Sequence, residues 1–208
     1  MIPGSPTSQI WKPNYGLQGY FPQGSMGEGA PVSRMVIVGC ANATALGTIA
    51  IAQNFLYAIP QVFPKEVVIS AVNINVTANV GGTNGRIGIY SNKSNHIPAP
   101  DKLLFDSGSI ATTSNGVKTV LCGLTLAPGL YWFTYVASGA TTATIRGVAI
   151  AGLSNTPSIP IGMGTVVDSG WTTAFTFGAL PYAFPNANPL GNGFPSPAIG
   201  LTLQYDTR

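Results

Sequence analysis

The chain has 208 residues, nine of them Lys or Arg and six Asp or Glu, so charged residues make up 7% of it, against roughly 25% in an ordinary soluble domain. A coiled coil or helical bundle is excluded, because such folds need charged outer faces and far fewer glycines and prolines than the 26 Gly and 17 Pro present. A charge-rich disordered tail is excluded as well, since 45% of the residues are apolar and 10% are aromatic. These figures favour an all-β protein whose surface is wetted by Thr, Ser, Asn and backbone groups.

Residues 1–34 predict an extended N-terminal arm. Five prolines and six glycines in this stretch prevent a helix and interrupt the hydrogen bonds of a β-ladder. Purely disordered linkers are poor in aromatic residues, whereas this arm carries the isolated rings of Trp11, Tyr15, Tyr20 and Phe21. We therefore expect the arm to anchor the protein by burying these rings on neighbouring subunits. Docking of the arm on its own domain is the alternative.

Residues 35–208 predict one β-sandwich domain, because sandwiches and barrels of this length are commonly undivided. Its core module is expected over residues 35–150, and an aromatic, loop-rich region with a closing strand over 151–208. The first strands are expected in the apolar runs Met35–Cys40 and Thr48–Tyr57, the second of which is broken by two polar residues.

The clearest strand pattern covers residues 72–78, where apolar residues alternate with Asn and Thr. That period of two predicts a strand with one face in a core and one face in water. A glycine-rich turn at 81–85 then leads into a strand over Arg86–Tyr90. A proline-containing loop over Ser91–Lys102 and a short strand over Leu103–Ser109 are expected next.

Two turns and a long apolar run define the rest of the core module. Asn115-Gly116 predicts a hairpin turn before an alternating strand over Val117–Leu126, and Pro128-Gly129 suits a tight type II turn. Leu130–Ala137 is apolar on both faces, so we expect this strand in the middle of the sandwich, covered on each side. A further strand is expected over Thr142–Ile150.

Tyr131 and Trp132 are adjacent in this run, so their side chains should point to opposite faces of one strand. We interpret both as core residues, because each can bury a large ring while its polar atom finds an acceptor. A sugar-stacking platform is the alternative interpretation.

The region after Ile150 is rich in turns and aromatic rings, and no charge occurs between Asp168 and Asp206. Its rings are candidates for contact with a surface or receptor, either by stacking on a sugar or by packing between subunits: Trp171, Phe175, Tyr182 and Phe184. Ile199–Tyr205 is the expected closing strand. The whole pattern predicts an all-β fold, a jelly-roll-like β-sandwich with an extended N-terminal arm and no helix.

The sequence contains few candidate catalytic residues. A glycoside hydrolase uses two carboxylates, and Asp101 and Asp106, which flank a strand, are interpreted as turn and solvation residues. His96 is the only histidine and lies in a proline-containing loop, and no serine has Gly-x-Ser-x-Gly surroundings. We therefore expect no enzymatic activity and no cofactor. A small hydrolase would depend on one of these three residues.

Metal, nucleic-acid and membrane binding are not expected either. Cys40 and Cys122, the only cysteines, cannot complete a four-ligand zinc site with one histidine; we interpret them as buried thiols, with a disulfide as the alternative. The basic residues are scattered singly, whereas nucleic-acid binding needs a clustered patch. Ala45–Phe63 is charge-free but interrupted by Gln, Asn and Pro, so no transmembrane helix is expected, and Met1–Pro6 does not predict a secretory signal.

The order and spacing of several short pieces carry a resemblance to a known type of module. These pieces are Asn73–Ala78, Arg86–Tyr90, Asp106–Gly108, Asn115–Lys118 and Leu124–Trp132. Together they make residues 46–150, about half the chain, similar to a β-sandwich module of bacteriophage tail-fibre and other virion proteins. The motifs are structural rather than catalytic, and both the arm and the aromatic region fall outside them.

This resemblance implies a bacteriophage virion structural protein, made in the host bacterial cytoplasm and located in the virion. A tail-fibre or baseplate-associated component that assembles through its arm is the first expectation. A capsid decoration protein and a carbohydrate-binding, receptor-recognition module are the alternatives. The implied partners are other copies of the chain, by analogy as a homotrimer, and other virion proteins; a host surface glycan is the partner in the receptor-recognition alternative.

Overall fold

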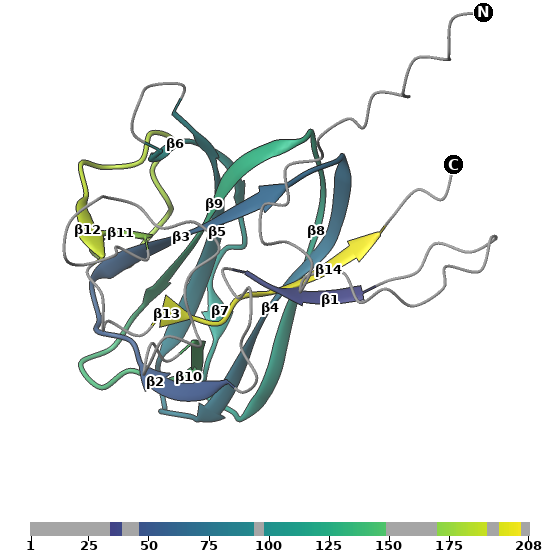
Figure 1. The fold of residues 1–208 in the computed structure, drawn as a ribbon. Coiled ribbons are helices and arrows are strands. Elements are labelled where there is room, and N and C mark those ends of the chain that lie inside the picture. Colours follow the sequence, from purple (N-terminus) through teal and green to yellow (C-terminus); the bar gives the residue numbers. More distant parts are fainter. Residues whose placement is uncertain (1–33, 39–45, 94–97, 149–169, 191–195, 205–208) are drawn as a thin grey trace, which may run out of the picture.

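The computed structural model describes residues 34–38, 46–93, 98–148, 170–190 and 196–204, and within these ranges all regular secondary structure is β. The prediction of an all-β fold is therefore confirmed (Figure 1). The strands are β1 (Arg34–Ile37), β2 (Gly47–Ala50), β3 (Phe55–Phe63), β4 (Val67–Ala78), β5 (Asn84–Asn92), β6 (Pro100–Asp106), β7 (Ile110–Ala111), β8 (Gly116–Leu126), β9 (Gly129–Ala137), β10 (Thr144–Val148), β11 (Gly170–Ala174), β12 (Asn188–Leu190), β13 (Ser196–Pro197) and β14 (Gly200–Gln204).

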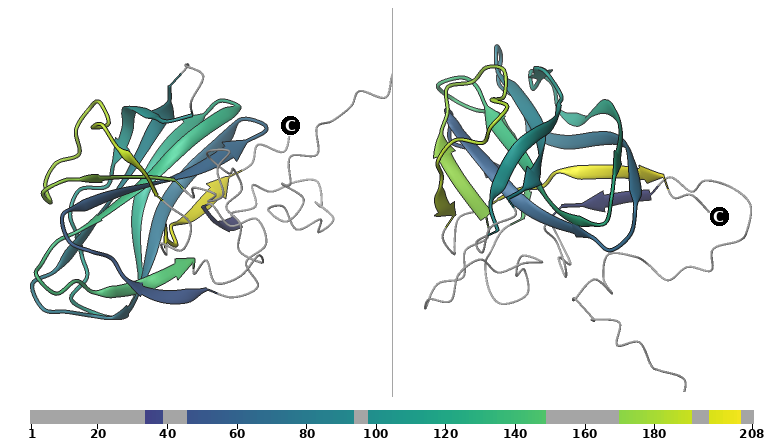
Figure 2. Two further views of the ribbon diagram at one scale, coloured as in Figure 1. Left: turned by 60° about the vertical axis from the view of Figure 1, so that its left-hand side comes forward. Right: turned by 90° about the horizontal axis from the view of Figure 1, so that it is seen from above.

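The strands form two antiparallel sheets that pack as a sandwich (Figure 2). Sheet A has the order β1-β14-β4-β10-β13, with β8 also paired to β4 and β2 to β10. Sheet B has the order β12-β11-β3-β9-β5-β6, with β7 paired to β5. The β-sandwich is thus confirmed, whereas its jelly-roll connectivity stays a prediction.

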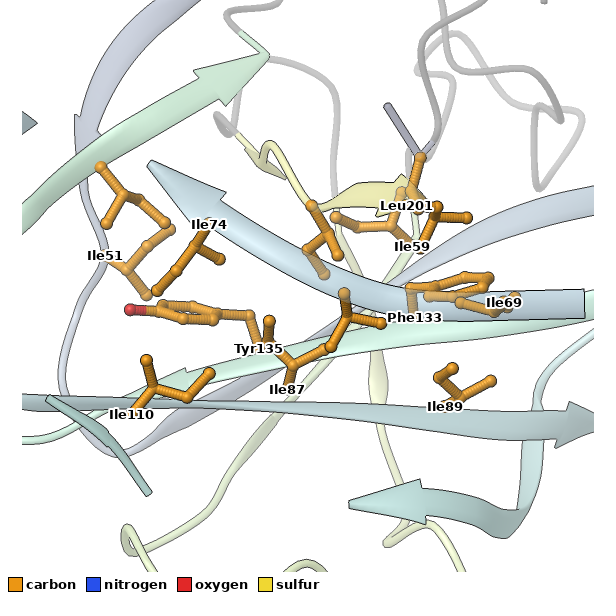
Figure 3. Packing of buried hydrophobic residues seen from close by; sticks show 14 of the residues in the cluster. Ile51, Ile59, Ile69, Ile74, Ile87, Ile89, Ile110, Phe133, Tyr135 and Leu201 are labelled. Carbon is orange, nitrogen blue, oxygen red and sulfur yellow. The ribbon is translucent and has the colours of Figure 1, made fainter. Parts of the chain in front are cut away.

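The main core lies between the two sheets and is built from the inward-facing residues of the long strands (Figure 3). Ile69 and Ile74 of β4 face Ile87 and Ile89 of β5 across this core, and Phe133 of β9 packs beside them. All five side chains are at most 1% exposed. Burying each such side chain contributes about 1.5–3 kcal/mol to stability, so this layer is the main source of stability in the sandwich.

Several strand predictions differ from the structure in detail; β5 and β6, for example, reach into the loop expected over Ser91–Lys102. The run Thr48–Tyr57 is divided between β2 and β3 by a turn in which Asn54 has φ of 59°, a left-handed conformation that Asn tolerates better than most residues. In β4 the polar face is less wet than the alternation suggests, because Asn73 is only 4% exposed. Its Nδ2 donates to Oγ1 of Thr202 on the neighbouring β14, at 3.3 Å. The side-chain amide of Asn73 is therefore satisfied by a hydrogen bond to the neighbouring strand rather than to water.

Sheet B carries a second apolar layer on its outer face, as expected for a strand that is apolar on both sides. Residues 175–187, which we call the covering segment, run across this face from the end of β11 toward β6 (Figure 1). Between this segment and the sheet lies an aromatic cluster, to which the segment itself contributes Leu180 and Phe184; its buried members from the sheet are Leu56, Ala58, Tyr90, Trp132 and Val136. The expectation that Leu130–Ala137 is covered on both faces is therefore confirmed, and the cover comes from the aromatic region of the same chain.

Two glycines allow this close packing. A Cβ at Gly88 of β5 would collide with Leu180 of the covering segment and lie 2.6 Å from Oγ1 of Thr134. A Cβ at Gly170 of β11 would collide with the backbone carbonyl of Ala58 on β3. Real Cβ contacts are not that short, so both positions need glycine for the neighbouring segments to approach.

Thr134, fully buried in β9, has a hydroxyl with no hydrogen-bond partner among the described residues. A buried polar atom without a partner costs stability. We expect Thr134→Val to stabilise the protein by about 1 kcal/mol, measured as a higher urea midpoint of unfolding.

Thr173 is the matched control for this substitution, because it is also buried but its Oγ1 donates to the carbonyl of Asn186 at 2.8 Å. Thr173→Val should lower the free energy of unfolding by about 1 kcal/mol. A lower midpoint for Thr134→Val than for the wild type would contradict the assignment of an unpaired hydroxyl.

Candidate functional site

Tyr131 and Trp132 lie on opposite faces of sheet B, as the alternation predicts. Trp132 is fully buried in the aromatic cluster, and its indole N–H donates to Oδ1 of Asn92 on β5 at 2.9 Å. Tyr131 is half-buried against the main core, with its ring centroid 6.1 Å from that of Phe63 and its hydroxyl donating to the carbonyl of Ala127 at 3.0 Å. Trp132 exposes no ring face, so it cannot act as a stacking platform in this state.

The four aromatic residues of the predicted contact surface do not share one exposed face. Phe184 is 7% exposed and packs edge-on against Tyr90, with ring centroids 5.1 Å apart. Trp171 and Phe175 are half-buried against the same aromatic cluster, and the indole N–H of Trp171 donates to the carbonyl of Pro98 at 3.0 Å. Only Tyr182 is well exposed, at 67%. Three of the four rings therefore pack on their own sheet, and the predicted contact with a surface or receptor stays a prediction.

The covering segment is tied to the edge of sheet B by backbone hydrogen bonds. The N–H of Leu103 donates to the carbonyl of Tyr182 at 2.7 Å, and the N–H of Phe184 donates to the carbonyl of Asp101 at 2.8 Å. The hydroxyl of Tyr90 donates to the carbonyl of Pro181 at 2.9 Å. These bonds hold the backbone around Tyr182 in place while its ring faces solvent.

Asp106 forms the ion pair that fixes this corner of the fold. Its two carboxylate oxygens accept hydrogen bonds from Nε and Nη2 of Arg86 at 2.6 and 2.7 Å. They also accept from the backbone N–H groups of Gly108, at 2.9 Å, and Leu180 of the covering segment, at 3.1 Å. The interpretation of Asp106 as a solvated turn residue is therefore wrong in part: it caps a turn, but its carboxylate is engaged in the fold.

The pKa of Asp106 reflects this environment. Burial by itself raises the pKa of a carboxyl group, but the hydrogen bonds from Arg86, Gly108 and Leu180 stabilise the charged form and outweigh it. The pKa therefore lies below its ordinary value, and the carboxylate is ionised and fully used at neutral pH. Such a group holds elements together and has little capacity left for proton transfer.

The remaining candidates of the sequence divide between described and undescribed residues. Cys122 is a half-buried free thiol on β8, and burial raises its pKa to about 11, so it is protonated at neutral pH and reacts slowly as a nucleophile. Asp101 is half-buried at the start of β6. The rest lie outside the described residues: Trp11, Tyr15, Tyr20, Phe21, Cys40 and His96.

The most unusual surface of the described sandwich is the edge of sheet A formed by β8. One side of β4 pairs with β14 and β10, and the other pairs with β8 over nine register positions (Figure 1). The only described strand that pairs with β8 is β4. Five large apolar side chains of the described residues are well exposed, and two are on β8: Val117 at 55% and Leu121 at 82%.

Two hollows open on the described surface. One, of about 150 Å³, lies on the outer face of sheet A and is lined in part by Asn73, Val117 and Arg146. The other is an open depression of about 740 Å³ between the β2–β3 turn and residues 140–142. In the described residues no group of three or more His, Cys, Asp or Glu side chains is placed to hold a metal ion. No helix in the described part of the chain is long and apolar enough to cross a membrane.

Comparison with known proteins gives no family assignment: no protein-family model matches the chain, and a search of curated proteins finds no significant match.

Sequence reasoning missed two features of the site: the polar partners of Asp106 and Trp132, and the exposed edge strand β8. Arg86 and Asp106 come together through the β5–β6 pairing, and Asn92 meets Trp132 through the β5–β9 pairing; separations of 20 and 40 residues along the chain give no direct sign of either contact. The exposure of Leu121 has a weak sign in the sequence, because Val120 and Leu121 are adjacent and one strand cannot turn both toward the same core.

Proposed function

We propose that the protein is a structural component of a bacteriophage virion, a tail-fibre or baseplate-associated subunit that assembles through its N-terminal arm. The phage assignment rests on the resemblance of residues 46–150 to virion β-sandwich modules. The segments that carry this resemblance have structural roles in the sandwich. Arg86–Tyr90 is the centre of β5, and Leu124–Trp132 is the tight connection from β8 to β9.

An assembly role is supported by where the sandwich places its charged and apolar side chains. Its partly buried ion pair, Arg86–Asp106, helps to hold the covering segment, because Asp106 also accepts a hydrogen bond from the N–H of Leu180. Its most exposed large apolar side chain, Leu121 among the described residues, lies on an edge strand. Interfaces between proteins are depleted of charge and enriched in apolar anchors. A body of this kind is suited to contact with other subunits.

The arm supplies the anchor in this proposal. An extended segment can recruit main-chain hydrogen bonds and insert its rings into pockets of a neighbour. Replacing Trp11, Tyr15, Tyr20 and Phe21 together with Ser should leave a folded, soluble protein that no longer enters particles. Tyr182→Ser, which removes an exposed ring from the body, is the control and should be incorporated normally. Normal incorporation of the arm variant would overturn the anchoring role.

The location of the protein tests the whole proposal. Quantitative mass spectrometry and immunogold labelling of purified particles, from the phage that encodes the chain, should detect it at the tail in a few to tens of copies. Hundreds of copies over the head would instead establish a capsid decoration protein. Its absence from purified particles would overturn the virion proposal in both forms.

Recognition of a host surface glycan is the second candidate, and the exposed ring of Tyr182 is the observation that favours it. The ring is 67% exposed on a backbone that β6 holds in place, which is the geometry of a stacking residue. Tyr182→Ala should abolish binding on a glycan array, while Leu104→Ala, another exposed position on the same edge, should not. Equal binding by all three proteins would remove this site.

A further inference from the structure

Among the described strands β8 pairs only with β4, so its other side forms an edge of sheet A in the part of the chain that the structure describes. β8 spans Gly116–Leu126 without a proline and has Lys118 as its only charged residue. Natural proteins protect such edges with short strands, charges, prolines, bulges or a covering segment, because the free N–H and C=O groups recruit another strand. On sheet B, the edge strand β6 is protected in this way, by a bridge between Lys102 and Ala183 of the covering segment.

A bulge divides the β8 edge into two parts. Ile69 pairs with Leu124 and Ala71 with Leu121, so that one residue of β4 faces two of β8, Cys122 and Gly123. Gly123 has φ of 64°, which glycine adopts without strain. The bulge interrupts the edge after Leu121, and the regular part therefore covers residues 116–121.

The outward side chains of this regular part are self-complementary. Val117, Thr119 and Leu121 are all exposed on β8, and alternation places them on the same face of sheet A. If a second copy pairs antiparallel about a twofold axis at Thr119, Val117 of each copy faces Leu121 of the other, and the two Thr119 residues face each other. Apolar pairs and Thr–Thr pairs in directly opposite positions stabilise antiparallel strands.

The charges and composition of the chain favour a second copy of β8, rather than the arm, as the strand that pairs with the β8 edge. In this register Lys118 faces Val120 of the partner, so the two ammonium groups are not opposed. The longest proline-free runs of the arm, 14–21 and 23–30, contain two and three glycines, which disfavour strand pairing, whereas residues 117–121 of β8 contain neither glycine nor proline.

We propose that two copies of the chain associate through antiparallel pairing of their β8 strands, which joins the two A sheets into one continuous sheet. The contact is isologous and produces a dimer, unlike the threefold association implied by analogy. Because one strand pair buries less surface than a standard interface, we expect a dissociation constant on the order of 10 µM for the isolated protein. This inference is independent of the virion proposal, since the dimer forms from purified protein whether or not the chain enters particles.

Cysteine cross-linking of the full chain tests the contact and its register. In a background with Cys40→Ser and Cys122→Ser, Thr119→Cys should form a disulfide-linked dimer on mild oxidation, because residues on the axis have Cβ atoms about 5 Å apart. Thr125→Cys is the matched control on the same strand and is also exposed. In the proposed register its two copies are about 40 Å apart, so it should stay monomeric on denaturing gels.

Sedimentation velocity of the unmodified chain supplies the second readout. The wild type should shift from monomer to dimer between about 1 and 100 µM, and Leu121→Lys, at an 82% exposed position, should stay monomeric while remaining folded. Tyr182→Lys, which changes an exposed aromatic residue elsewhere, should still dimerise. A wild type that is monomeric or trimeric at 100 µM, or a dimer without the Thr119 cross-link, would overturn the proposal. A dimer that is lost on deletion of residues 1–30 would instead identify the arm as the occupant and overturn the proposal too.

Discussion

Trp132→Ala should lower the free energy of unfolding by about 4 kcal/mol, the largest effect expected of a single substitution in this protein. Trp132 is fully buried in the aromatic cluster, between Pro60 of β3 and Tyr90 of β5 in the register of sheet B. Truncation removes most of the apolar contact of a large ring and leaves a cavity under the covering segment. It also leaves Oδ1 of Asn92 without its indole donor. Urea denaturation followed by circular dichroism measures the loss.

Trp132→Ala should first destabilise the region around the aromatic cluster, before it affects the whole domain. Hydrogen exchange by mass spectrometry should show faster exchange in the covering segment and in β6, while β4 and β14 of sheet A keep their protection. Trp132→Phe retains a ring but not the N–H donor, and we expect a loss of about 1–2 kcal/mol. Tyr182→Ala removes a ring that is 67% exposed and should change stability by less than about 0.5 kcal/mol. A destabilisation by Trp132→Ala that matches Tyr182→Ala would contradict the placement of the indole.

The sequence around Trp132 illustrates which features of this fold can be predicted from sequence and which cannot. Period-two alternation and an apolar run depend on nearest neighbours along the strand, and they predict the all-β class, the two-faced burial of β9 and the opposite directions of Tyr131 and Trp132. They do not predict what covers the second face. The covering segment comes from about 50 residues further along the chain, and pairing at such separation leaves no local pattern.

The same limit explains the aromatic region. Trp171, Phe175 and Phe184 have the composition of an exposed contact surface and equally that of an inner layer, because a ring that buries itself on its own sheet and one that waits for a partner look alike in sequence. The burial of Phe184 against Tyr90 and the hydrogen bonds from the covering segment to β6 distinguish the two cases, and those hydrogen bonds are made by backbone atoms. Tyr182 is an aromatic residue like the other three, and it differs from them only in the exposure of its ring.

Replacing Asp106 should have the second largest effect. Asp106→Asn keeps the size of the side chain but removes the charge that pairs with Arg86, whose side chain is only 16% exposed. A partly buried cation without its partner is unfavourable, and the contacts with the N–H groups of Gly108 and Leu180 are weakened as well. Because the pair is partly exposed, we expect a loss of about 2 kcal/mol at pH 7, measured by urea unfolding. Asp101→Asn on the same strand is the matched control and should stay within about 0.5 kcal/mol of the wild type.

The pH dependence separates this charge effect from a packing defect. The pKa of Asp106 is lower in the folded protein than in the unfolded chain, where it is about 3.9, so its contribution is fully present above that value and is lost as the pH falls through the folded pKa. The wild type should therefore lose stability below about pH 4, while Asp106→Asn lacks this particular loss, and the two unfolding free energies should converge toward pH 2. A difference that persists unchanged at pH 2 would assign the effect to packing. The double variant Arg86→Gln and Asp106→Asn should recover part of the loss at pH 7, because it removes the cation that the single variant leaves uncompensated.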